Sequence, residues 1–323
     1  MSLNKPIWKL RDWIDEKNLK WYYLSKNPNA IELLKKNPDK IDWWRLSMNE
    51  DPGAVELLES NPDKNNWFSV LSENPTAIKL LEANQDIINW SQLSGNPNAM
   101  KLLKANPDKI DWYALSGNPN AIELLEANPD KIDWYALSGN PNAIELLEAN
   151  PDKIDWYALS GNPNAIKLLE ANPDKIIWYQ LSHNPNAMKL LEANPHKINW
   201  HHLSTNPNPR AIKILEENTD KIEWFSLSEN QNPRAIKIME QNQDKIHWRW
   251  LCLNPNAIEI LEKNRDKIQW DLFSKNPAIF QLDYEAMKIA NEGIYEELIK
   301  EVMKPSRVFK NPDYDYLEEL FGD

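Results

Sequence analysis

The chain has one cysteine, 7 glycines and fewer basic than acidic residues, and these shortages exclude whole classes of protein. A single cysteine, Cys252, excludes an intrachain disulfide and cysteine-rich zinc modules. The 37 Lys and Arg against 49 Asp and Glu give a net charge of −12, which argues against wrapping of phosphate backbones. Residues 1–6 lack the apolar run of a secretion signal, and no segment approaches the roughly 20 apolar residues of a membrane span. We expect an acidic protein that is neither secreted nor membrane-bound.

Tryptophan and proline, by contrast, are abundant, with 16 and 23 residues. Residues 117–138 and 139–160 are identical and read GNPNAIELLEANPDKIDWYALS. A tryptophan recurs mostly every 22 residues, and the spacing widens to 24 where one joint of the repeat carries an insertion. The recurring positions are Trp21, Trp43, Trp67, Trp90, Trp112, Trp134, Trp156, Trp178, Trp200, Trp224, Trp248 and Trp270. The sequence is therefore a tandem array of about twelve copies, each of 22–24 residues.

Most copies contain two Asn-Pro pairs, and each pair predicts the start of a short helix. Asn is a favoured N-cap residue, and Pro suits the first helical position because it has no N–H to leave unbonded. Gly139 is expected to end the second helix in the left-handed conformation. The predicted helix caps in two copies are Asn118, Asn128, Asn140 and Asn150. Such short helices are marginal alone, so we predict an all-α fold, an α-solenoid of two-helix repeats stabilised by stacking.

We call each equivalent position of the repeat a slot. The slots whose residue barely changes between copies predict the core of this solenoid. They include Trp112, Trp134, Trp156, Trp178, Leu115, Leu137 and Leu159. An open array needs terminal units with a polar outer side. We therefore expect an N-terminal cap with a first half-repeat at residues 1–26, the array at 27–282, and a C-terminal helical cap or tail at 283–323, with helices near 283–303 and 311–320.

A leucine-rich-repeat-like solenoid is the alternative fold. Residues 132–140 can be written LxxLxLxxN, and a period of 22 residues suits that family. The slot of Tyr135, however, holds Arg249 and Asp271 in other copies, which a buried strand position would not accept. This favours the helical fold.

The motif LSxNPNAIxLLxxNPDKIDWxxLS resembles tandem-repeat proteins that large DNA viruses of algae and amoebae, of the phycodnavirus and mimivirus types, encode in multiple copies. Residues 276–284 and 304–307 are similar to the usual ending of those proteins, and the resemblance covers about residues 8–310. It implies a viral origin and a location in the host cytoplasm or the virion. By analogy with ankyrin-type arrays in large viruses, it implies a binding role.

The repeat argues against an enzyme, because a catalytic site needs unlike groups that converge and a repeat spreads identical groups along a line. We expect no cofactor and no metal. The histidines occupy different slots, and nothing in the repeat forces them together; they are His183, His196, His201, His202 and His247. Recurring lysines such as Lys131 could contact phosphates, one nucleotide per repeat, but Asp130 and Asp133 flank this lysine.

The slot after each tryptophan varies most and is rich in aromatic residues. Residues of this slot, together with Trp250 of the following slot, form the candidate partner-binding surface, which we call the rim. It consists of Tyr22, Trp44, Phe68, Tyr113, Tyr135, Tyr157, Tyr179, His201, Phe225, Arg249 and Trp250. Aromatic residues are enriched at protein interfaces, but these rings could equally pack between copies with their hydroxyls in water. The favoured function is a non-enzymatic protein–protein interaction scaffold. The alternatives are a structural virion component and, least favoured, a single-stranded nucleic-acid binder.

Overall fold

The computed structural model describes residues 6–62 and 68–291. They form two compact units: unit 1 contains residues 6–10 and 280–291, and unit 2 contains residues 11–62 and 68–279. The predicted all-α solenoid is confirmed, because unit 2 is a succession of short helices in a repeating pattern and its described residues include no strand. The leucine-rich-repeat alternative, which needs a strand in each copy, is therefore wrong.

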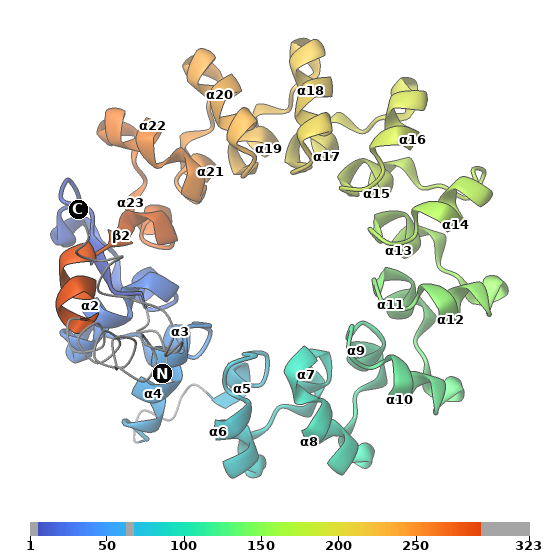
Figure 1. Cartoon of the computed structure of the whole chain (residues 1–323), viewed down its shortest axis with the longest axis horizontal. Coiled ribbons are helices and arrows are strands. Elements are labelled where there is room, and N and C mark those ends of the chain that lie inside the picture. Colours follow the sequence, from blue (N-terminus) through green and yellow to red (C-terminus); the bar gives the residue numbers. More distant parts are fainter. Residues whose placement is uncertain (1–5, 63–67, 292–323) are drawn as a thin grey trace, which may run out of the picture. The chain divides into compact units, whose positions relative to one another are not determined.

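The α-helices of unit 2 form two rows, and helices alternate between the rows along the chain (Figure 1). The inner row holds the tryptophan helices: α1 (Trp21–Leu24), α3 (Trp43–Leu46), α5 (Phe68–Leu71), α7 (Trp90–Gly95), α9 (Trp112–Ser116), α11 (Trp134–Gly139), α13 (Trp156–Gly161), α15 (Trp178–His183), α17 (Trp200–Thr205), α19 (Trp224–Glu229), α21 (Trp248–Leu251) and α23 (Trp270–Phe273). The outer row holds α2 (Ile31–Lys35), α4 (Pro52–Glu59), α6 (Ile78–Ala83), α8 (Met100–Ala105), α10 (Ile122–Glu126), α12 (Ile144–Glu148), α14 (Ile166–Ala171), α16 (Met188–Ala193), α18 (Pro209–Glu217), α20 (Pro233–Gln241) and α22 (Ile258–Lys263).

Short 3₁₀ turns connect the two rows. They are η1 (Glu16–Asn18), η2 (Pro28–Ala30), η3 (Pro38–Lys40), η4 (Gln85–Ile87), η5 (Pro97–Ala99), η6 (Pro107–Lys109), η7 (Pro129–Lys131), η8 (Pro151–Lys153), η9 (Pro195–Lys197), η10 (Thr219–Lys221), η11 (Gln243–Lys245), η12 (Pro255–Ala257), η13 (Arg265–Lys267) and η14 (Pro277–Ile279). A proline at the first turn position suits such turns, because its φ is already helical and its missing N–H costs nothing there.

The two Asn-Pro pairs of a copy act differently, which corrects one prediction. Asn118 accepts a hydrogen bond from the backbone N–H of Asn120 at 3.0 Å, and Asn140 does the same with the N–H of Asn142. Asn128 and Asn150 lie at the N-cap positions of η7 and η8, but their side chains make no capping hydrogen bond there. They instead donate from Nδ2, each at 2.9 Å, to the carbonyl oxygen four residues earlier and so close the preceding outer helix.

The inner helix has its own cap because the chain is extended before it. Ile132, with φ −66° and ψ 127°, separates η7 from α11 and is buried. Asp133 then caps α11 by accepting from the N–H of Ala136 at 2.8 Å. The prediction that Gly139 ends this helix in the left-handed conformation is wrong, since Gly139 lies in α11 and no described glycine has a positive φ.

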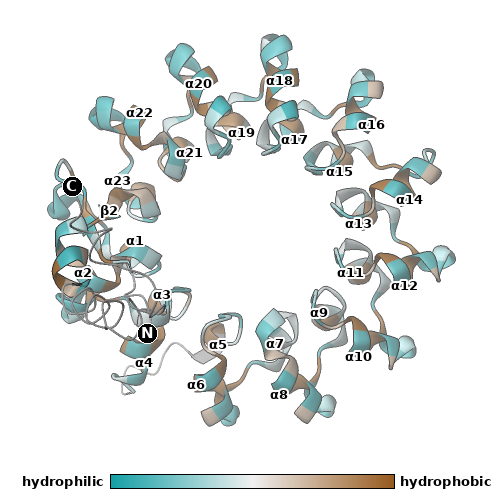
Figure 2. Cartoon of the chain, viewed as in Figure 1, coloured by the Kyte–Doolittle hydropathy of each residue, from teal (hydrophilic) through white to brown (hydrophobic). Residues whose placement is uncertain are grey.

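Leucine and alanine fill the interior between the two rows. Leu115, Leu137 and Leu159 are fully buried, as is Ala143. The recurring indoles lie nearer the surface, because Trp112, Trp134, Trp156 and Trp178 are only half-buried. In Figure 2 the outer helices are hydrophilic on the parts that point away from the inner row. The core is therefore a thin layer between the rows.

A buried asparagine joins each copy to the one before it. Asn140 donates from Nδ2 to the carbonyl oxygens of Ser116 and Asn118, both at 3.0 Å. The same pair of bonds, at 2.8–3.3 Å, recurs for Asn27, Asn49, Asn74, Asn96, Asn118, Asn162, Asn184, Asn206, Asn230, Asn254 and Asn276. We call this series the asparagine ladder. It satisfies carbonyl oxygens that would otherwise be buried without a partner.

A serine completes each junction. Ser116 Oγ accepts the backbone N–H of Asp133 in the next copy at 3.0 Å and donates to the Trp112 carbonyl oxygen at 2.7 Å. Cys252 takes this serine position, and its Sγ accepts the N–H of Gln269 at 3.3 Å.

The ladder has no free end within unit 2. Asn27, in the first copy, donates to the carbonyl oxygens of Ser274 and Asn276, in the last copy, at 3.2 and 3.0 Å. Asn29 Nδ2 donates to the Pro277 carbonyl oxygen at 3.0 Å, and the Lys20 N–H donates to Ser274 Oγ at 2.9 Å. We call this junction the seam. Unit 2 is therefore a closed circle of copies, where the sequence predicted an open array with a cap at each end.

Unit 1 brings together segments from the two ends of the described chain. Strand β1 (Trp8–Leu10) pairs antiparallel with β2 (Phe280–Leu282), with Lys9 opposite Gln281. Asp283 Oδ1 then accepts the N–H of Ala286 at 3.1 Å and starts a helix that continues to residue 291. The rest of the predicted helix at 283–303 and the one at 311–320 lie outside the described residues. Among the described residues, no helix has the length and apolar character needed to cross a membrane.

Candidate interaction surface

The predicted rim lies on the inner row, where it forms a line of exposed aromatic side chains. Each is the second residue of its inner helix, and successive inner helices pack on one another, as α11 packs on α13. The exposed fraction ranges from 38% for Trp44 to 60% for Tyr113. The exposed rings are Tyr22, Trp44, Tyr113, Tyr135, Tyr157, Tyr179 and Phe225. Phe68 begins α5, and its side chain lies outside the described part.

The other rim residues are polar or partly covered. His201 and Arg249 are exposed, whereas Trp250 is half-buried and packs edge-on against Phe225, with ring centroids 5.3 Å apart. Side chains of this slot also reach the next copy, since Ser91 donates to Asp111 at 2.6 Å, and this bond lowers the pKa of Asp111. The slot therefore contacts its neighbour and still presents surface to solvent.

The surface is shallow. The inner helices α7 and α9 line a hollow of about 410 Å³, with Ser91, Gln92 and Tyr113 in its wall. A shallow row of rings suits an extended partner better than a small molecule, which proteins normally enclose in a deeper pocket.

The recurring lysines lie over the tryptophans of the preceding copy. Lys131 Nζ is 4.7 Å from the centre of the Trp112 ring, and Lys153 Nζ is 4.6 Å from that of Trp134. The same contact joins Lys40 to Trp21, Lys109 to Trp90, Lys197 to Trp178, Lys221 to Trp200 and Lys245 to Trp224. These lysines thus cover the half-buried indoles.

We expect the Lys131→Ala substitution to lower the free energy of unfolding by about 0.5–1 kcal/mol, because it removes a cation from the face of an indole. Urea denaturation of the purified chain would measure the change. Lys189→Ala, which removes an exposed lysine from α16, is the matched control and should have a smaller effect. Equal losses for the two variants would contradict a role for the ring contact.

Three histidines converge, which corrects the sequence-based expectation. The ring of His202 lies 5.8 Å from that of His183 and 5.2 Å from that of His201. Tyr179 packs edge-on against His202 with centroids 4.1 Å apart, and the buried His202 Nε2 has no hydrogen-bond partner in the described part of the chain. Burial, and secondarily the two neighbouring histidines, lower the pKa of His202 below its usual 6.5. Among the described residues, no group of His, Cys, Asp or Glu has the arrangement of a metal site.

The lowered pKa predicts that acid destabilises this part of the array. Between the folded-state pKa and 6.5, the unfolded chain binds a proton at His202 that the folded chain does not bind. The free energy of unfolding should therefore fall as the pH drops through 6.5 and level off below the folded-state pKa. Urea denaturation at several pH values would measure this slope. His202→Ala should flatten it, whereas Gln180→Ala, in the same slot one copy earlier, should keep it; an unchanged slope in His202→Ala would contradict the assignment.

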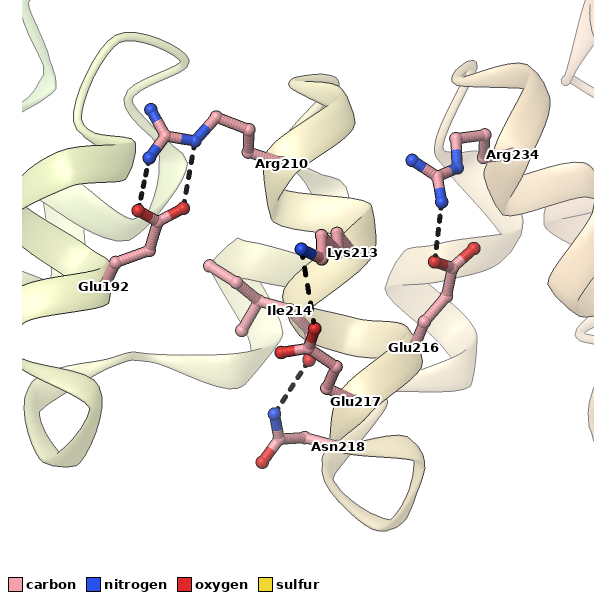
Figure 3. A network of polar contacts seen from close by, with 8 residues as sticks. All are labelled: Glu192, Arg210, Lys213, Ile214, Glu216, Glu217, Asn218 and Arg234. Atoms are coloured by element: carbon pink, nitrogen blue, oxygen red, sulfur yellow. Dashed lines mark hydrogen bonds and ion pairs between the residues drawn. The ribbon is translucent and has the colours of Figure 1, made fainter.

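Exposed ion pairs join successive copies along the outer row (Figure 3). Arg210 on α18 pairs with Glu192 on α16 through two nitrogens, and Arg234 on α20 pairs with Glu216 on α18 at 2.9 Å. Exposed pairs of this kind contribute little stability, since water and salt screen them. They mark the outer row as a solvated surface.

Cys252 is a buried thiol at a junction between two copies. It is buried, and burial raises the pKa of its thiol, which disfavours the thiolate that a nucleophile needs. Its structural role is that of the serine it replaces.

The chain matches none of the protein families, curated proteins or solved structures with which it was compared.

Proposed function

We propose that this protein is a non-enzymatic interaction scaffold that binds a protein partner through the aromatic row of its inner helices. One observation carries the proposal. Of the large hydrophobic side chains that are exposed among the described residues, all but Tyr284 and Ile289 occupy the single slot after the recurring tryptophan.

Exposed rings at a regular spacing have no evident folding benefit. Burial of a ring stabilises a fold, whereas Tyr113, Tyr135 and Tyr179 remain about half exposed or more. Contiguous apolar surface on a protein commonly marks an interaction site, and Tyr and Trp are enriched at the centres of interfaces. A partner that covers the row would bury these rings and gain the stabilisation that folding leaves unused.

The ladder supports this role because it holds the row rigid. Each inner helix is tied to the previous copy by two buried amide hydrogen bonds and one serine bond, as at Asn140 and Ser116. A surface that is ordered before binding loses less conformational entropy when the partner arrives. The repeating pattern also argues against catalysis, since like groups recur along most of the row.

Affinity capture from cell extracts, followed by mass spectrometry, tests the proposal. The test variant carries Tyr135→Ala, Tyr157→Ala and Tyr179→Ala on three successive inner helices. The control variant carries three exposed substitutions on the outer helices of the same region: Glu123→Ala, Glu145→Ala and Lys167→Ala. We expect the parent and the control to retain a specific partner that the tyrosine variant loses. Equal recovery by all three proteins, or recovery of no specific protein, would overturn the proposal.

A further inference from the structure

The side chains of Arg45 and Lys275 pack against two tyrosines on the inner row at the seam, and Lys26 lies near them. Arg45, in α3, places its Cζ 4.4 Å from the centre of the Tyr22 ring and 5.9 Å from that of Tyr23. Lys275, which follows α23, places its Nζ 4.5 Å from the centre of the Tyr23 ring. Lys26 follows α1, and its N–H donates to the Tyr23 carbonyl oxygen. We call these five residues the seam cluster; they come from the last, first and second copies and meet because unit 2 closes.

The basic groups of the seam cluster have acidic neighbours but form no ion pair within the described part of the chain. Among the described residues, neither Lys26, Arg45 nor Lys275 forms an ion pair, although many other basic residues of the chain do. Arg45 donates from one terminal nitrogen to Tyr22 Oη at 2.5 Å, and its buried Nε has no hydrogen-bond partner among residues 6–62 and 68–291.

The basic groups also repel one another. Burial lowers the pKa of Lys275, and the charges of Arg45 and Lys26 lower it further, while Asp271 and Tyr22 oppose the shift. In a chain with a net charge of −12, three cations from three copies lie close together at this one place. An added anion would relieve the repulsion.

We propose that the seam cluster binds carboxylate side chains of an acidic segment in the protein partner. This proposal rests on the proposed function and specifies the chemistry of the partner. The planar guanidinium of Arg45 suits a carboxylate through paired N–H donors, and Lys26 and Lys275 add charge around it. Tyr22 and Trp44 are exposed beside Arg45, whose Cζ lies 4.9 Å from the centre of the Trp44 ring, and they offer apolar surface to the rest of the segment.

The surroundings favour a short acidic peptide over a nucleic acid. Glu50 and Glu73 line a small hollow together with Lys26, so acidic side chains begin directly beside the cluster. A long polyanion would extend from the cluster onto these carboxylates and into the field of an acidic protein. A short segment can place its charges on the cluster alone.

Fluorescence anisotropy of labelled probes with the purified full-length chain tests this proposal. The probes are an oligoglutamate peptide that contains one tyrosine, an oligolysine peptide of the same length, and an oligothymidine strand. We expect saturable binding of the oligoglutamate peptide alone, weakened by added salt. Loss of one charge-assisted contact should weaken it by roughly tenfold or more in R45Q and in K275Q.

The control is K189Q, which removes an exposed lysine from the outer helix α16 and changes the net charge by the same amount. It should bind the peptide as the parent does, and R45K, which keeps the charge, should bind better than R45Q. Circular dichroism of each variant establishes that it is folded. The proposal is overturned if K189Q weakens binding as much as R45Q, if the oligoglutamate peptide does not bind, or if oligothymidine binds equally well.

These results are separate from the test of the aromatic row. If the oligoglutamate peptide fails to bind but the tyrosine variant still loses its captured protein, the scaffold proposal stands and only the acidic character of the partner is wrong. If capture shows no tyrosine dependence but the peptide binds, the seam cluster is an anion site and the aromatic row is not the interface.

Discussion

The Asn140→Ala substitution is expected to lower the free energy of unfolding by about 2–4 kcal/mol, because a buried acceptor that loses its donor bears the cost of its own desolvation. The Asn140 side chain is only 1% exposed. Its Nδ2 is a donor to the carbonyl oxygens of Ser116 and Asn118, and its Oδ1 is the acceptor for the N–H of Asn142. Alanine would leave both carbonyl oxygens buried without these donors and would add a small cavity.

Asn142→Ala is the matched control, two residues away in the same copy. Asn142 also donates across the junction, to the Pro119 carbonyl oxygen at 2.9 Å, but it is exposed, so water can replace its bond. We expect a loss below about 1 kcal/mol for this variant. Urea denaturation of the two variants and the parent would measure the difference. Equal losses would mean that burial of the ladder adds no stability.

Much of this architecture could be predicted from the sequence because it depends on local chemistry. The period follows from identical copies, and the helical fold follows from capping residues and apolar spacing within each copy. The different roles of Asn118 and Asn128 are harder to predict, because both precede a proline. The distinction arises after the turn that follows each pair, where Ile132 leaves the turn in an extended conformation to bury its side chain, while Ala121 leads directly into α10.

The parts that could not be predicted depend on contacts between copies. His183 and His202 occupy different slots, yet they meet because the end of one inner helix packs beside the middle of the next. The two histidines are 19 residues apart, which is three fewer than one repeat. This separation indicates a contact only when the stacking of the inner helices is already known. The residues of the seam cluster are even farther apart in the sequence, since Lys275 lies in the last copy and Tyr23 in the first.

Whether unit 2 closes into a circle depends on the small rotation that relates each copy to the next. No single residue determines this rotation. Copies with the same buried ladder could stack into an open spiral or into a circle, depending on the sum of the rotations. The two arrangements use the same junctions, so the residues of one copy cannot distinguish them. They differ in one place, which is whether the first copy has a neighbour before it.

Asn27→Ala therefore tests closure, and we expect it to lower the free energy of unfolding by about 2–4 kcal/mol, as for Asn140→Ala. In the closed array, Asn27 Nδ2 donates to Ser274 and Asn276 of the last copy, and alanine leaves those buried carbonyl oxygens without donors. In an open array no copy would precede Asn27, and the same substitution would remove only the turn bond to Asn29 at 3.1 Å. The loss would then be nearer to 0.5–1 kcal/mol, the contribution of one ordinary hydrogen bond.

Hydrogen exchange supplies a second measurement that does not depend on cooperative unfolding. The Lys20 N–H donates to Ser274 Oγ across the seam, so in the closed array it should exchange slowly, like the N–H of Asp133 at the equivalent position of an interior junction. Ser274→Ala should accelerate exchange at Lys20, and Ser116→Ala should do the same at Asp133. Rapid exchange at Lys20 in the parent chain, together with a small effect of Asn27→Ala, would show that the seam is open in solution. The seam cluster would then lack Lys275, and its affinity for an acidic peptide would fall to that of the remaining two cations.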